Sequence, residues 1–151
     1  MQTNFHLIKP LFQGFEWFDE GLQRSLKAAG WAPVTRPESM VILHVLGGET
    51  RPADIARALR LSRQAVHSTI ASLVEAGFFA LAPDPADGRV KIVVLTDKGR
   101  AMKDDADRIV ERLAIALEKR IGKREMAALR GVFATDWGEP VTIEVAHQDR
   151  S

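Results

Sequence analysis

The chain has 151 residues, of which 46% are hydrophobic and 27% are charged, as in an ordinary globular protein. Its net charge is only +1, which excludes a generic polycation. It contains no cysteine, which excludes disulfide frameworks, thiolate metal sites and a cysteine redox switch within the chain. Because no apolar run is long enough to span a membrane and the first six residues do not resemble a signal peptide, we expect a cytoplasmic protein.

The first predicted element is an amphipathic helix from Ile8 to Ala29, with Pro10 in its first turn and Gly30 after its end. Its apolar residues recur at steps of three and four, as a helix requires: Ile8, Leu11, Phe12, Phe15, Phe18, Leu22 and Leu26. This stripe is longer and richer in phenylalanine than a small domain needs to cover itself. It therefore predicts a packing surface for a second subunit.

A connector with two prolines, residues 31–37, leads to a predicted helix over residues 38–46. The apolar residues that we expect this helix to offer to the core are Met40, Val41, Leu43 and Leu46. Thr50 and Arg51 are candidates for a short extra strand, and Pro52 opens the next helix.

Two short helices joined by a tight turn come next, over residues 54–60 and 62–76. Ser62 can cap the second helix, and Gly77 can end it in the left-handed conformation. Its apolar stripe is predicted to face the core: Val66, Thr69, Ile70 and Leu73. The opposite face is small and polar: Gln64, Ser68, Ala71 and Ser72, with Arg63 and His67 at its edge.

Two β-prone runs, residues 78–82 and 90–95, flank a loop rich in proline, aspartate and glycine, and together they predict a hairpin. Thr96 can cap a long helix over residues 97–121, which Gly122 ends. A last helix, residues 123–135, is expected to direct four residues inward: Met126, Leu129, Val132 and Phe133. The tail over residues 138–151 is expected to be flexible rather than an added strand.

The polar side of the second short helix suits the major groove of DNA, where bulky outward side chains would prevent close approach. The segment from Arg51 to Val74 is also locally basic, with four arginines against one aspartate. We therefore predict a set of DNA-contacting residues: Arg51, Ser62, Arg63, Gln64, His67 and Ser68, with Arg89 of the hairpin loop in the minor groove. The alternative for the helix is a solvated polar face, and for Arg89 an ion pair with Asp87 or Asp84.

The order helix, turn, helix, hairpin resembles the winged helix-turn-helix of the MarR family of bacterial transcriptional regulators. The residues that carry the resemblance are Asp87-Gly-Arg89 in the loop and Leu95-Thr-Asp-Lys-Gly99 after it. Asp87 and Gly88 would support the wing. Arg60 departs from the family, which commonly has glycine in the turn. A left-handed arginine costs on the order of 1 kcal/mol, so the turn either differs in shape or tolerates this strain.

The resemblance implies a mainly α fold with a small β-hairpin wing, in which a winged lobe joins a helical dimerisation layer. The expected parts are residues 1–35, an N-terminal dimerisation helix and connector; 36–97, the DNA-binding lobe; 98–137, C-terminal dimerisation helices; and the tail from 138. It further implies a cytoplasmic homodimeric repressor of an inverted-repeat operator in double-stranded DNA. A small-molecule effector would release the repressor.

Trp17 and Trp31 are candidates for the wall of an effector pocket for a small aromatic ligand, although a role in the dimer core explains them more simply. The histidines are scattered and the acids Asp104, Asp105 and Asp107 do not converge on one point, so we expect no metal and no cofactor. The sequence has no phosphate-binding loop and no nucleophile motif, which argues against an enzyme. The alternative function is a winged-helix protein-interaction module that does not bind DNA.

Overall fold

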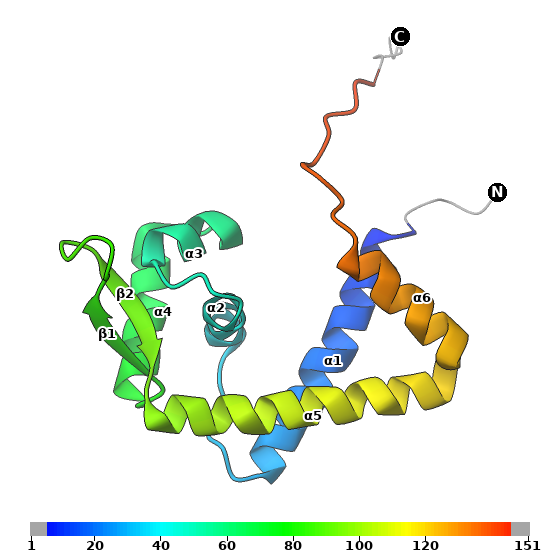
Figure 1. Ribbon diagram of the computed structural model, residues 1–151, viewed down its shortest axis with the longest axis horizontal. Coiled ribbons are helices and arrows are strands. Elements are labelled where there is room, and N and C mark those ends of the chain that lie inside the picture. Colours follow the sequence, from blue (N-terminus) through cyan, green and yellow to red (C-terminus); the bar gives the residue numbers. More distant parts are fainter. Residues whose placement is uncertain (1–5, 146–151) are drawn as a thin grey trace, which may run out of the picture. The chain divides into compact units, whose positions relative to one another are not determined.

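The structure is a computed structural model that describes residues 6–145. Within this range it contains six helices and one two-stranded antiparallel hairpin (Figure 1). The elements, in chain order, are α1 (Ile8–Ala28), α2 (Arg36–Leu46), α3 (Pro52–Leu59), α4 (Arg63–Glu75), β1 (Phe79–Pro83), β2 (Lys91–Leu95), α5 (Asp97–Ile121) and α6 (Lys123–Ala134). The predicted fold class, mainly helical with a small hairpin wing, is confirmed.

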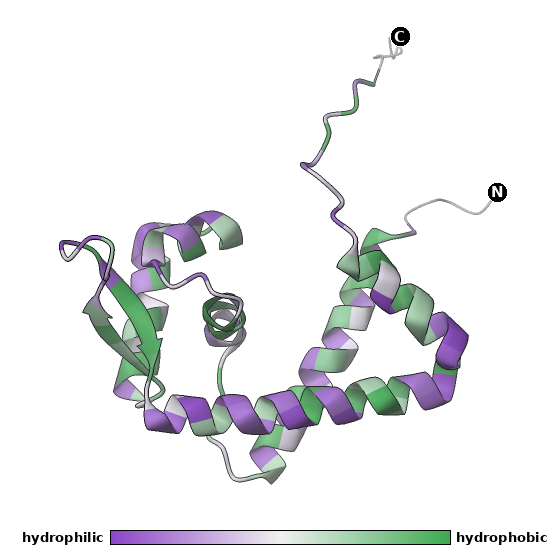
Figure 2. Cartoon of the chain, in the orientation of Figure 1, coloured by the Kyte–Doolittle hydropathy of each residue, from purple (hydrophilic) through white to green (hydrophobic). Residues whose placement is uncertain are grey.

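The chain divides into two compact units, the first ending at Ala114 and the second beginning at Ile115, so that α5 crosses the boundary. The hairpin packs alongside α4 in the first unit (Figure 1). The residues of its strands pair in register from Phe79 with Leu95 to Pro83 with Lys91. Polar and apolar residues alternate along α5, whereas β2 is hydrophobic along most of its length (Figure 2).

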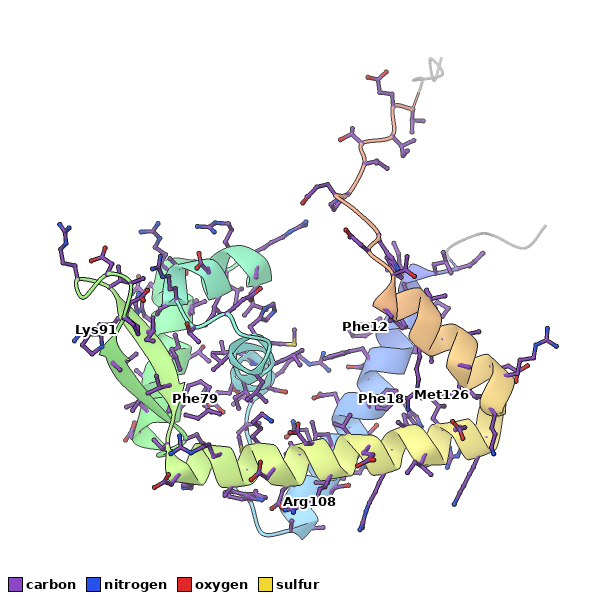
Figure 3. All side chains as sticks on the ribbon, in the orientation of Figure 1. Phe12, Phe18, Phe79, Lys91, Arg108 and Met126 are labelled. Carbon is purple, nitrogen blue, oxygen red and sulfur yellow. The ribbon has the colours of Figure 1, made fainter. Side chains whose placement is uncertain are left out.

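The core of the first unit lies between α2, α3, α4 and the hairpin. Phe79, labelled in Figure 3, points from β1 into this core. Its most deeply buried side chains are Val41, Ile55, Val66, Ile70, Leu73, Phe78, Phe79 and Val93. Full burial of one such side chain stabilises the fold by about 1.5 to 3 kcal/mol. These apolar side chains from several elements hold the lobe together. Those that come from α4 alternate with polar residues that face outward.

The start of α2 differs from the prediction by two residues. Thr35 caps the helix by accepting a hydrogen bond from the amide of Glu38, and the Glu38 carboxylate accepts one from the amide of Thr35. This capping box places Pro37 in the first turn, where its missing amide hydrogen is tolerated. The predicted connector is shorter as a result.

The core face of α2 was predicted only in part. Val41 and Val45 are buried, and Met40 and Leu46 are half-buried. Leu43 is 53% exposed, so its assignment to the core was wrong. Because Leu43 lies two residues from both valines, helical geometry turns it about 200° away from them.

The predicted third strand is absent from residues 6–145, because the chain leaves the sheet after a single contact. The amide of Val93 donates to the carbonyl of Thr50 at 2.9 Å. Arg51 then has an extended backbone and serves as the N-cap of α3, which begins at Pro52.

In α6, Met126 is buried as predicted. The other three residues that were expected inward, Leu129, Val132 and Phe133, are exposed in the single chain, which contradicts that expectation. After α6 the indole of Trp137 donates to the carbonyl of Val132 at 2.9 Å and stacks on Phe133. Residues 139–145 form neither a helix nor a strand, and the rest of the tail lies outside the described residues.

Candidate nucleic-acid interface

The N-terminus of α4 is fixed by its cap. Ser62 has an extended backbone, and its hydroxyl oxygen accepts a hydrogen bond from the amide of Ala65 at 3.1 Å. Val66, Ile70 and Leu73 are buried, which turns the opposite side of the helix outward. The predicted cap and the orientation of the helix are therefore both present.

Four predicted contact residues lie together on the outward side of α4, near its start. Arg63, Gln64, His67 and Ser68 are exposed, and none of their side chains has a hydrogen-bond or ion-pair partner within residues 6–145. An unpartnered side chain can give its full hydrogen-bonding capacity to a ligand without first breaking a bond in the protein. This group, Arg63, Gln64, His67 and Ser68, is called the reading face below.

The turn before α4 contains a left-handed arginine. Arg60 has φ 53° and ψ 40°, and it is the one non-glycine residue with positive φ in the described part of the chain. Its amide, and that of Leu61, donate to carbonyls of the last turn of α3. Of the two possibilities, a different turn or tolerated strain, the structure has the strained turn, at a cost on the order of 1 kcal/mol.

The wing loop between β1 and β2 is organised by Asp84. Its amide donates to the carbonyl of Val90 at 2.8 Å, and its carboxylate accepts from the amide of Ala86 at 2.8 Å. Asp84 is the one buried polar or charged residue in the described part of the chain, with 9% of the residue exposed. The hydrogen bond from Ala86, followed by the one from Arg51, lowers the pKa of Asp84 below its ordinary value.

Arg51 is the donor that approaches Asp84 from α3. Its Nε lies 2.7 Å from Oδ2 of Asp84, although the two residues are 33 positions apart in the sequence. Arg51 was predicted to contact DNA, and the structure engages it in an ion pair with the wing. The side chain of Arg51 is still 44% exposed, so the ion pair and a phosphate contact are compatible.

Arg89 projects from the wing loop, with 95% of its side chain exposed. The carboxylate of Asp87 accepts from the amide of Arg89 at 3.1 Å and lies 3.5 Å from its guanidinium. The restraint is therefore mainly on the backbone of Arg89, and the ion pair of the side chain is loose. Gly88, between them, lies in open space.

Two further exposed cations, Arg60 and Lys91, were not among the predicted DNA-contacting residues. Arg60 is exposed in the turn before α4, and Lys91, labelled in Figure 3, is exposed at the start of β2 beside the wing loop. Neither side chain has a partner in the described part of the chain. Arg60 was counted in the basic segment of the sequence, and Lys91 follows Arg89 by only two residues, so the sequence alone could have added both to the predicted contact residues.

A separate cavity of about 290 Å³ lies between α1, α2 and the first half of α5. Its walls are mainly apolar, with Asp19, Gln23 and Ser39 among its few polar residues. Neither Trp17 nor Trp31 lines it. The indole of Trp31 donates to the carboxylate of Asp105 at 2.8 Å and packs near Phe78, and Trp17 packs edge-on against Phe18. The residues predicted as pocket walls thus have other contacts.

No helix of the described chain is both long enough and apolar enough to span a membrane. Among the same residues there is no group of three or more histidines and acids that could hold a metal ion.

Residues 32–90, which contain the helix-turn-helix and most of the wing, match the model of the MarR family. The resemblance to this family that the sequence predicted is confirmed by this match. No curated protein matches the chain with significant similarity.

The fold also matches solved structures over most of its length. The reduced form of MarR from E. coli has 21% sequence identity and a TM-score of 0.68, covering 88% of this chain and 97% of its own. BpsR of Bordetella bronchiseptica, whose DNA binding is regulated by 6-hydroxynicotinic acid, has 18% identity and a TM-score of 0.62, covering 89% and 94%. A MarR-family regulator from Rhodococcus sp. RHA1 has 20% identity and a TM-score of 0.61, covering 88% and 95%. At these identities the likeness establishes the winged-helix fold.

Proposed function

Because the helix-turn-helix segment matches the MarR family and the chain has the fold of such regulators, we propose that this protein is a sequence-specific DNA-binding transcriptional regulator. It acts in the cytoplasm as a homodimer on an inverted-repeat operator, and it represses by excluding polymerase from the site. A small-molecule effector releases it.

The observation that carries this proposal is the unpartnered reading face beside an exposed wing arginine. An α-helix fits the major groove, where Gln64 can pair with adenine through two hydrogen bonds and Arg63 can pair with guanine or a phosphate. Arg89 projects from the wing loop with its side chain almost fully exposed, and an arginine of this kind can enter the neighbouring minor groove. Arg60 and Lys91 add sequence-independent attraction to phosphates at the two edges of this surface.

The dimer follows from what an operator requires. Two reading helices must lie about 34 to 36 Å apart to enter the major groove on successive turns. The first turns of α1 expose Ile8, Leu11 and Phe12, and the last turns of α6 expose Val132 and Phe133. Apolar residues grouped on a helix face in this way are typical of a surface that a second subunit covers.

The effector site that we propose is the cavity lined by α1, α2 and α5. Its apolar walls and few polar groups suit a small organic molecule. A ligand there lowers operator affinity only by as much as it prefers the form of the dimer that does not fit DNA. The regulation of BpsR by 6-hydroxynicotinic acid is a precedent for such control in a protein of the same fold.

Selection of bound sites from random duplex DNA, followed by affinity measurements on the recovered site, tests the function. We expect an inverted repeat whose half-site centres are one helical turn apart. The logarithm of the binding constant should fall with the logarithm of salt concentration with a slope of about 0.9 for each phosphate neutralised. Failure to bind any duplex at low salt would contradict the proposal and favour the interaction module, whose apolar contacts respond weakly to salt.

A further inference from the structure

Glu38, in the first turn of α2, makes two hydrogen bonds in different directions. Its Oε2 accepts from the amide of Thr35 at 2.8 Å, which completes the cap of its own helix. Its Oε1 accepts from the hydroxyl of Ser72 on α4 at 2.9 Å. A single carboxylate therefore joins the start of α2 to the helix that carries the reading face.

The same turn of α2 is also joined to α1. The hydroxyl of Ser39 lies 3.3 Å from a carboxylate oxygen of Asp19 and 3.5 Å from the side-chain amide of Gln23. Arg36 forms an ion pair with Glu16, one turn earlier on α1. Ser39, Asp19 and Gln23 all line the cavity. The first turn of α2 is thus a joint between the cavity wall on one side and α4 on the other.

Ser72 lies one helical turn after Ser68 on the polar side of α4. The sequence gives these two serines the same character, but the structure gives them different surroundings. The hydroxyl of Ser68 has no partner in the described chain, and that of Ser72 is bonded to Glu38. The polar side of α4 therefore has a free portion near its start and a held portion near its end.

We propose that Glu38 is a positioning residue that sets the rotation and tilt of the reading face through Ser72. The inference rests on the proposed function, because it concerns the same DNA-binding helix. Apolar packing on Val66, Ile70 and Leu73 is non-directional and leaves a helix some freedom to roll. A hydrogen bond to a carboxylate is directional and stronger than a neutral one, so it removes much of that freedom.

The geometry also connects the cavity to the helix that carries the reading face, through the first turn of α2. Ser39 and Glu38 are neighbours in one helical turn, so a ligand that displaces Ser39 from Asp19 and Gln23 moves the residue that holds α4. Residues 63–68 lie about 6 to 14 Å from Ser72 along the helix axis, at 1.5 Å per residue. A small rotation at the joint is therefore carried to the reading face.

The decisive variant is Ser72→Ala, which removes the hydroxyl and leaves the cap of α2 intact. Ser72→Thr retains the hydroxyl and serves as the rescue. Ser25→Ala is the matched control, because Ser25 is also a helical serine and its hydroxyl bonds only to the carbonyl of Gly21 in its own helix. Affinity is measured for the selected operator and for versions with one base pair added to or removed from the spacer.

We expect Ser72→Ala to lower affinity for the selected operator about three- to tenfold, the range for one lost hydrogen bond. It should lower affinity for the operators with a longer or shorter spacer by a smaller factor. The ratio of affinities between the selected operator and the altered ones should therefore fall. A loss of folded protein would lower all three affinities by the same factor. Ser72→Thr should restore discrimination, and Ser25→Ala should leave it unchanged.

A second measurement does not depend on DNA. Because the chain has no cysteine, spin labels can be attached through His67→Cys on α4 and Lys27→Cys on α1, with excess unlabelled protein present. We expect Ser72→Ala to shift or broaden the distribution of label distances, with recovery in Ser72→Thr. An unchanged distribution would overturn the inference. If the wild-type protein binds no duplex, the proposed function fails, and the label distances alone decide whether Glu38 positions α4.

Discussion

The guanidinium of Arg51 and the carboxylate of Asp84 meet across the boundary between α3 and the wing, with Nε 2.7 Å from Oδ2. Arg51 is the N-cap residue of α3, and Asp84 organises the wing loop that ends in Arg89. The pair therefore fixes the wing relative to the helix-turn-helix. Under the proposed function, this fixed angle keeps Arg89 and the reading face aligned with adjacent grooves of DNA.

Replacing Asp84 with asparagine should lower the free energy of unfolding at neutral pH. It should also make that free energy change less as the pH falls into the acid range. The folded-state pKa of Asp84 is lower than its ordinary value of 3.8, so its stabilising contribution is present above that value. The contribution is lost as the pH falls through the lowered pKa. Urea unfolding at pH 7 and near pH 3 should show that the gap between wild type and variant narrows in acid. Asp54→Asn, which breaks the exposed pair with Arg57, is the control and should have a much smaller effect at pH 7.

Arg89→Ala should weaken operator binding without affecting the fold, because the side chain is almost fully exposed. The slope of the logarithm of the binding constant against the logarithm of salt concentration should become shallower by about 1, as expected for one lost phosphate or minor-groove contact. Fluorescence anisotropy at several salt concentrations measures this slope. An unchanged slope, with an unchanged unfolding curve, would mean that the wing does not touch DNA.

Arg60→Gly should separate stability from binding. Glycine removes the strain of the left-handed turn, so we expect the free energy of unfolding to rise by up to about 1 kcal/mol. The same change removes a cation beside the reading face, so operator affinity should fall. Arg60→Asn is the matched variant, because asparagine also tolerates the left-handed conformation and also lacks the charge. A loss of both stability and affinity in these variants would contradict this account of the turn.

Ile8→Glu should disrupt the proposed dimer. Ile8 is exposed at the start of α1, and burying a glutamate against a second subunit is strongly unfavourable. Sedimentation at micromolar concentration should show a monomer. Leu81→Glu is the control, since Leu81 is an exposed leucine on the wing, away from the proposed dimer elements. Dissociation by both variants, or by neither, would contradict the assignment of α1.

Gly99→Ala should be severely destabilising, by about 3 kcal/mol. An added Cβ would lie 2.1 Å from the carbonyl oxygen of Phe78, and a backbone atom cannot move aside as a side chain can. Gly14→Ala is the contrasting variant, because it lies in the middle of α1 with open space around it. That change should stabilise the protein by about 0.5 to 1 kcal/mol. Thermal unfolding of both variants checks the pair.

Features of the fold that depend on neighbours in the sequence could be predicted from it. Ser62 and Gly77 mark the limits of α4 because a cap and a left-handed stop are local events, and the bounds of α5 agree for the same reason. The exposure of Leu43 was missed because six of the last seven residues of α2 are apolar, and such a run does not show which of them form the buried face.

Contacts between distant segments could not be predicted. The pairing of Arg51 with Asp84 joins residues 33 positions apart, and no local pattern distinguishes an arginine that holds the wing from one that contacts phosphate. The serines of α4 give a second example, since only the fold brings Glu38 to Ser72 and leaves Ser68 unpartnered. The sequence suggested Trp17 and Trp31 as walls of an effector pocket, but neither residue lines the cavity between α1, α2 and α5.

The contact of Gly99 with Phe78 has a mechanical consequence. The hydroxyl of Thr96 donates to the carbonyl of Gly77 and also lies within hydrogen-bond distance of the carbonyl of Phe78, and Lys98 donates to the carbonyl of Ala76, so the start of α5 is bonded to the residues that follow α4. With no room for even a methyl group at Gly99, the two cannot slide past each other. The beginning of α5 is therefore locked to residues 76–78, so a displacement of α5 is passed directly to the C-terminal end of α4 and to the first strand of the wing.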